Sequence, residues 1–239
     1  MIQKISLRTR LLTVGVSLSV IPILLILWLV YNNNQKMSRI ALEECTSLAR
    51  TDLDHIIQGV YAMCKSHKGV IQQSVDSSLI VAQEVLEGAG EVRFSQTETV
   101  QWNAVNQYTK ESTTVTLPKM LVGDTWLKKN TDLNVISPIV DDVKRRVGGT
   151  CTIFQRMNEA GDMLRVCTNV EKLDGTRAVG TYIPKINPDG RLNPVISTVL
   201  NGEVYRGIAY VVNAWYITAY KPIFDNNGRV VGILYVGIK

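Results

Sequence analysis

Hydrophobic and polar residues follow three patterns along the chain. From Leu11 to Tyr31, the run LLTVGVSLSVIPILLILWLVY contains no charged residue. Between residues 36 and 87, apolar residues recur mostly at steps of three, four or seven, which is the spacing of one helix face. After residue 91, short segments rich in β-branched and aromatic residues are separated by Gly, Asn, Asp and Pro, which is typical of strands and turns. The sequence therefore predicts a membrane span, a long helix and a strand-rich domain, in that order.

The apolar run at residues 11–31 predicts a transmembrane helix, because about 20 such residues cross a bilayer core of about 30 Å. Lys4, Arg8 and Arg10 precede it without an acidic residue, so the positive-inside rule predicts a cytoplasmic N-terminus at residues 1–10. A cleaved signal peptide is the alternative, but its apolar core is usually only about 7–15 residues long and YNNNQK offers no small-residue cleavage site. We expect one span in the inner membrane, with the bulk of the chain periplasmic or extracellular.

Residues 32–90 predict a long helix outside the membrane, ended by the glycines of GAGE at 88–91. Its apolar stripe needs a partner surface. One interpretation is that it packs only on its own domain. The other is a parallel homodimer, since two anchored copies would share one orientation. The stripe consists of Met37, Ala41, Leu48, Ile56, Val60, Met63, Val70, Ile71, Val75, Leu79, Ala82 and Leu86.

Residues 91–239 predict an α+β domain. Strands are expected in VRF, TETVQWNAV and TTVTLPKMLVG, and a hairpin is expected where CTIFQRMN and MLRVCTNV flank the turn NEAGD. A helix is expected over residues 137–149, with Ser137 as its N-cap, Pro138 in its first turn and Gly148-Gly149 at its exit. A shorter helix is expected at VISTVLNG.

The end of the sequence predicts three consecutive antiparallel strands, VYRGIAYVV, WYITAYKPIF and RVVGILYVGI. A tight connection at Asn213-Ala214 joins the first two, and DNNG joins the last two. Pro222 has no N–H donor, so its part of the strand should lie at an edge or a bulge. The fold class is therefore α+β: a PAS-like antiparallel sheet with short covering helices, mounted on a long N-terminal helix that one transmembrane helix precedes.

The composition argues against nucleic-acid binding. The net charge is +5 and the pI is about 9.0. However, three of the 26 basic residues flank the predicted span, which leaves the exported part nearly neutral against 21 acidic residues. No basic stripe with interleaved aromatic residues is present.

The cysteines and the missing motifs limit the chemistry further. Cys45 and Cys64 lie too far apart on one predicted helix for a disulfide within the chain. Cys151 and Cys167 flank the predicted hairpin, where they form either a cross-strand disulfide or, as we favour, two small buried apolar residues. The sequence contains no CxxCH haem motif, no paired CxxC, and no GxSxG or HExxH string. We therefore expect no metal, no cofactor and no enzymatic activity.

Several segments resemble the extracytoplasmic single-Cache sensor family, in the form of a Cache 3/Cache 2 fusion domain. They are TVQWNAVNQ, VTLPKMLVG, VGGTCTIFQRMNEAGDMLRVCTNV, GTRAVGTYIP, NPVISTVLNGEVYRG and the final stretch from Tyr210 to Ile238. The resemblance covers residues 36–239. It implies a domain at the N-terminus of methyl-accepting chemotaxis receptors and some sensor kinases, which senses small molecules and often short carboxylates.

The sequence departs from that family at its end. Receptors of the family continue after the last strand into a second span and a signalling module, whereas this sequence ends at Lys239. We expect one of two situations. Either the sequence is part of a bacterial chemoreceptor or related receptor, or it is a standalone membrane-anchored solute-binding or interaction module without an output domain.

The resemblance implies a ligand site on the concave face of the sheet, beneath the short helices. A carboxylate there needs a cationic donor, hydroxyl or indole donors, and apolar walls. Strand alternation puts Tyr220 on the face opposite to Trp215 and Lys221, so the candidates cannot all point inward. The candidates are Arg156, Tyr182, Tyr210 and Trp215, which we rank first, followed by Arg165, Tyr220 and Lys221.

Overall fold

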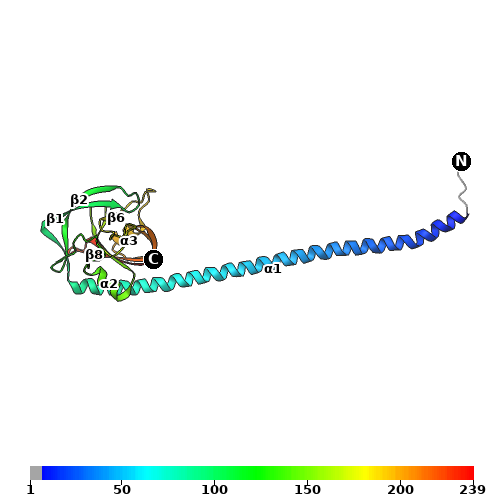
Figure 1. Cartoon of the computed structure of the whole chain (residues 1–239), viewed down its shortest axis with the longest axis horizontal. Coiled ribbons are helices and arrows are strands. Elements are labelled where there is room, and N and C mark those ends of the chain that lie inside the picture. The colour runs from blue at the N-terminus through cyan, green and yellow to red at the C-terminus, as the bar shows by residue number, and fades with distance from the viewer. Residues whose placement is uncertain (1–6) are drawn as a thin grey trace. The chain divides into compact units, whose positions relative to one another are not determined.

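The computed structural model describes residues 7–239, so Lys4 of the predicted cytoplasmic segment lies outside the described residues. The chain divides into two compact units, one ending at Cys64 and the other running from Lys65 to Lys239. A single helix, α1 (Leu7–Ala89), belongs to both units (Figure 1). The predicted membrane span and the predicted long helix are therefore parts of one continuous helix, with no break near residue 31.

The first unit consists of the N-terminal part of α1. Among the described residues, α1 is the one helix that is long and apolar enough to cross a membrane. The hydroxyls of Thr13, Ser17 and Ser19 donate to backbone carbonyls one turn earlier, at 2.9, 2.7 and 3.0 Å. Polar groups in this apolar stretch are thus satisfied within the helix, as a bilayer requires.

The second unit is built on one sheet. Within residues 7–239 the sheet has nine strands in the order β3-β2-β1-β6-β5-β4-β9-β8-β7. All neighbours are antiparallel except β1 and β6, which are parallel. The strands are β1 (Val92–Asn106), β2 (Ser112–Val122), β3 (Thr125–Trp126), β4 (Thr150–Arg156), β5 (Met163–Thr168), β6 (Thr181–Ile183), β7 (Tyr205–Val211), β8 (Ala214–Phe224) and β9 (Val230–Ile238). This confirms the predicted α+β, PAS-like fold, and the parallel pair of β1 and β6 is the one departure from the predicted antiparallel sheet.

The two faces of the sheet bury separate cores. The C-terminal part of α1 and the helix α2 (Val140–Val147) cover one face, where Val75 and Leu79 of α1 pack with Ile153 of β4. The helix α3 (Pro194–Leu200) packs on the other face, in a core that includes Phe154. Adjacent residues of β4 thus point to opposite cores, because side chains alternate along a strand. We call these the α1 face and the α3 face.

Most predicted elements are present, with some corrections at their ends. The hairpin of β4 and β5, the helix at VISTVL and the three final strands are confirmed. The helix predicted over 137–149 is shorter, and Ser137 is not its N-cap: Ile139 occupies that position without a side-chain hydrogen bond. The Ser137 hydroxyl instead accepts a bond from Asn130, 2.8 Å away. Gly148 ends the helix with a φ of 71°, as predicted for the exit.

The turn before β8 also differs slightly from the prediction. It consists of Val212 and Asn213, one residue earlier than the predicted Asn213-Ala214, and Val212 has a positive φ of 59° although it is β-branched. Pro222 lies beyond Tyr220, the last residue of β8 that pairs with β7. At Pro222, β8 is therefore the edge of the sheet, as predicted.

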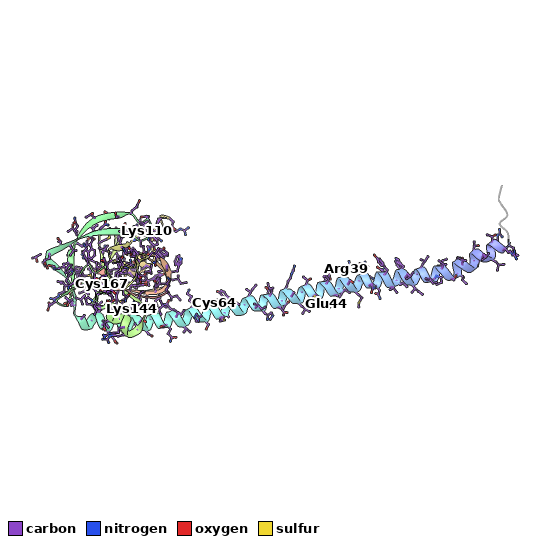
Figure 2. All side chains as sticks on the ribbon, viewed as in Figure 1. Arg39, Glu44, Cys64, Lys110, Lys144 and Cys167 are labelled. Carbon is purple, nitrogen blue, oxygen red and sulfur yellow. The ribbon has the colours of Figure 1, made fainter. Side chains whose placement is uncertain are left out.

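The four cysteines are unpaired thiols. Cys151 and Cys167 are buried, whereas Cys45 and Cys64 are exposed on α1. Figure 2 shows Cys64 on the helix and Cys167 inside the sheet domain. The structure thus agrees with the favoured interpretation of Cys151 and Cys167 as small buried residues.

Candidate functional site

Strand β5 carries Arg165 into the interior of the domain on the α3 face. The side chain is completely buried. Its Nη1 donates to Oγ1 of Thr181 on β6. The guanidinium lies over the ring of Phe154, 4.8 Å from the ring centroid. Since Phe154 belongs to the core of the α3 face, Arg165 points to that face as well.

The guanidinium of Arg165 has unused hydrogen-bond donors. Within residues 7–239, its Nε and Nη2 have no hydrogen-bond partner. Its one bonded nitrogen, Nη1, donates to a neutral hydroxyl and not to a carboxylate. Burial lowers the pKa of Arg165 to about 10, which leaves the side chain charged at neutral pH. A buried cation with free donors and no acidic partner is suited to binding an anion.

A second buried arginine in the same domain, Arg177, has hydrogen-bond partners for all of its guanidinium nitrogens. Arg177 is 1% exposed. Its Nη1 and Nη2 donate to the two carboxylate oxygens of Asp141 at 2.9 and 2.8 Å. Its remaining donors reach backbone carbonyls, including those of Asp132 and Thr168 at 2.9 and 3.0 Å. Arg177 is therefore a structural residue, whereas two guanidinium nitrogens of Arg165 remain available to a ligand.

Aromatic side chains surround Arg165. Tyr220 and Tyr235, from β8 and β9, have ring centroids 4.7 Å apart and both lie beside Phe154. Burial raises the pKa of Tyr220 and Tyr235 well above the ordinary value of 10.0, so both hydroxyls stay protonated. The Tyr235 hydroxyl pairs with that of Thr150 at 3.0 Å. We call Arg165, Phe154, Thr181, Tyr216, Tyr220 and Tyr235 the Arg165 cluster.

The turn that follows β1 meets the start of α3. The Tyr108 hydroxyl accepts a hydrogen bond from Nδ2 of Asn193 at 3.1 Å. The other end of the Asn193 amide caps α3, because its Oδ1 accepts from the N–H groups of Val195 and Ile196. The buried side chain of Gln107 donates to the backbone carbonyl of Tyr210 at 3.3 Å. This corner therefore joins β1, β7 and α3.

The structure brings two of the predicted site residues together. Arg165 and Tyr220 belong to one cluster, although they were ranked below others. Tyr210 approaches the same region through Tyr108, on which it stacks with a centroid distance of 6.0 Å. Trp215 packs against Tyr210 at 5.6 Å but is 66% exposed.

The other three predicted residues lie elsewhere. The Arg156 guanidinium donates to three backbone carbonyls, at Asn158, Val230 and Glu159, and lines a separate groove of about 320 Å³. Tyr182 packs against the core of the α1 face. Lys221 donates to Gln83 of α1, which also places it on that face.

Sequence reasoning missed Gln107, Tyr108, Thr181 and Tyr235, and it did not select Tyr216. Alternation along β8 puts Tyr216 on the same face as Tyr220, so the sequence does carry a signal for that residue. Tyr235 could have been found by extending the alternation to β9, where it pairs with Tyr220. Within residues 7–239, no group of three His, Cys, Asp or Glu side chains could hold a metal ion.

Comparison with known proteins agrees with this architecture. The family model of the Cache 3/Cache 2 fusion domain matches residues 38–239. The search of curated proteins gave no match. Cache domains are extracellular, non-catalytic ligand-sensing domains of signalling receptors. Because the matched region covers most of the sequence, the chain belongs to the Cache 3/Cache 2 fusion domain family.

Proposed function

We propose that this domain is the sensor of a bacterial transmembrane chemoreceptor or related receptor, and that it binds a short carboxylate at the Arg165 cluster. The observation that carries the proposal is the completely buried guanidinium of Arg165, with free Nε and Nη2 atoms. A carboxylate can accept two parallel bonds from these donors. It would also neutralise a charge that the described residues leave without an acidic partner.

The surrounding residues suit a small ligand. Phe154, Tyr220 and Tyr235 provide apolar walls, and the protonated hydroxyl of Tyr220 provides a further donor. The walls come from β4, β8 and β9, and β9 is the last strand before Lys239. A ligand that prefers one arrangement of these strands over another shifts the equilibrium between them by that difference in affinity. This is the physical basis on which such a domain can signal.

The test is a titration of the full chain in detergent micelles with a panel of short carboxylates. We expect one or more of them to raise the melting temperature of the wild type and to have no effect on Arg165→Met. Arg156→Met is the matched control, because the Arg156 guanidinium is already bonded to backbone carbonyls. A stabilising carboxylate that acts equally on Arg165→Met would contradict the proposal.

A further inference from the structure

Gln107 carries a buried hydrogen-bond acceptor without a partner. The residue is 1% exposed. Its Nε2 donates to the carbonyl oxygen of Tyr210, whereas its Oε1 has no partner within residues 7–239. Rotating the amide by 180° would bring Oε1 against that carbonyl oxygen, and two acceptors repel each other. The orientation of the amide is therefore fixed, with the acceptor as its unused end.

Gln107 lies beside β6, the strand whose Thr181 bonds Arg165. Val105 pairs with Thr181 on the parallel strand β6, and Thr181 is the residue that bonds Arg165. Gln107 is the first residue after β1, and β6 lies between β1 and β5, the strand that carries Arg165. The next residue, Tyr108, stacks on Tyr210 and accepts a hydrogen bond from Asn193 at the start of α3. The free donors of Arg165 and the free acceptor of Gln107 are therefore both buried, on either side of β6.

The backbone holds this acceptor in place. The Lys110 ammonium donates to the carbonyl oxygens of Gln107 and Val212 at 2.7 and 3.2 Å, which ties the β1–β2 turn to the β7–β8 turn. The N–H of Gln107 also donates to the carbonyl of Tyr182 at 3.1 Å. A rigid, unpaired acceptor favours ligands that bring a donor and penalises those that do not.

We propose that the ligand is a small hydroxycarboxylate, whose carboxylate pairs with Arg165 and whose hydroxyl donates to Oε1 of Gln107. This inference rests on the proposed function, because it assigns a second contact to the same ligand. A hydroxyl fits better than an ammonium group. Once the carboxylate has neutralised Arg165, an ammonium group would add a buried charge, and Arg165 itself bonds no acidic side chain within residues 7–239.

The experiment compares acids that differ by one group, using calorimetric titration of the full chain in detergent micelles. Glycolate is compared with acetate, and lactate with propionate; alanine is the ammonium counterpart of lactate. We expect the hydroxy acid of at least one pair to bind about tenfold more tightly than its parent acid, and alanine to bind no more tightly than propionate. Equal affinities within both pairs, or tightest binding of alanine, would overturn the inference.

Gln107→Leu removes the acceptor and leaves Arg165 intact. We expect this variant to lose the tenfold preference for the hydroxy acid while it binds the parent acid as the wild type does. If Gln107→Leu does not fold, the wild-type comparison still decides. The two proposals fail differently: carboxylates that bind through Arg165 without a hydroxyl preference contradict only this inference. The absence of any binding, or binding unchanged in Arg165→Met, contradicts both.

Discussion

Two buried arginines of the sheet domain differ in what surrounds them, and this difference can be measured. Arg177 pairs with both oxygens of Asp141, whereas Arg165 has one bond, to Thr181. We predict that Arg177→Met lowers the free energy of unfolding by about 3–5 kcal/mol, because it leaves the Asp141 carboxylate without its ion-pair partner. Arg165→Met should instead leave stability unchanged or raise it by about 1–2 kcal/mol, since it removes an unpaired buried charge.

The measurement is chemical denaturation of both variants in the absence of carboxylates. A loss of several kcal/mol in Arg165→Met would mean that Arg165 holds the fold together, and this would count against an open binding group. The contrast matters because both side chains are arginines at buried positions of one domain. Residue type and burial are therefore matched, and only the bonding differs.

Buried thiols predict how stability depends on pH. Burial raises the pKa of Cys151 far above the ordinary value of 9.0, and that of Cys167 to about 12. In the unfolded chain both thiols lose their protons near pH 9, so the folded state binds more protons above that pH. Stability contributed by these groups is thus complete below pH 9 and is lost as pH rises.

We predict that the wild type loses up to about 1.4 kcal/mol per pH unit and per thiol above pH 9. In the double variant Cys151→Ala/Cys167→Ala, the free energy of unfolding should decline less steeply between pH 9 and 10. Above that range, tyrosine ionisation adds a further decline. Denaturation curves at each pH provide the free energies. Identical slopes for wild type and variant would contradict the assignment.

At the scale of elements, the end of α1 depends on one glycine of the GAG sequence and not on the other. Gly90 has a φ of 119°, and an added Cβ would lie 2.6 Å from the Cα of Gly123. Gly88 is helical and an added Cβ would meet nothing within 4 Å. We predict that Gly90→Ala destabilises the fold by about 2 kcal/mol or more, whereas Gly88→Ala is neutral or stabilising by up to about 1 kcal/mol.

Thermal unfolding of the two variants checks this prediction, each being the control for the other. If Gly90→Ala has the same melting temperature as the wild type, the close approach between the end of α1 and the β2–β3 turn does not constrain the fold. The change adds the same methyl group two residues apart, so differences in composition cannot explain a difference in stability.

The elements could be predicted from the sequence, whereas the candidate site could not. The helix α1 was predicted from a hydrophobic period of 3.6 residues, and the strands β7, β8 and β9 from a period of two. Both periods can be read from a short stretch of sequence. The site did not follow, because it depends on which strands become neighbours. Phe154, Arg165 and Tyr235 meet only through the pairing of β4 with β5 and β9. The ranking of Arg156 above Arg165 failed to anticipate the bonds of Arg156 to its own hairpin, which no pattern in the sequence reveals.

At the scale of the whole molecule, the predicted topology places everything after Tyr31 outside the cytoplasm. Cys45 and Cys64 are exposed, and Cys151 and Cys167 are buried. We predict that a membrane-impermeant maleimide modifies Cys45 and Cys64 in intact spheroplasts and modifies the buried pair only after denaturation. Mass spectrometry identifies the modified residues. Labelling of Cys45 and Cys64 only after the membrane is permeabilised would reverse the topology.

The long helix leads to a prediction about assembly. Of its apolar stripe, Val75, Leu79 and later residues are buried in the sheet domain, whereas Val60 and Met63 are 56% and 74% exposed. Exposed apolar residues at helical spacing favour a partner helix, and two copies anchored in one membrane can pair only in parallel. We therefore propose a parallel homodimer through this part of α1.

In such a dimer, equivalent residues of the stripe lie opposite each other. In a background without Cys45 and Cys64, we predict that Val60→Cys forms an intermolecular disulfide under mild oxidation, visible as a dimer on a non-reducing gel. Gln58→Cys is the control, because two residues turn the helix by about 200° and place this position away from the stripe. Equal cross-linking of both variants would indicate random collision, and the exposed apolar residues of α1 would then need another explanation.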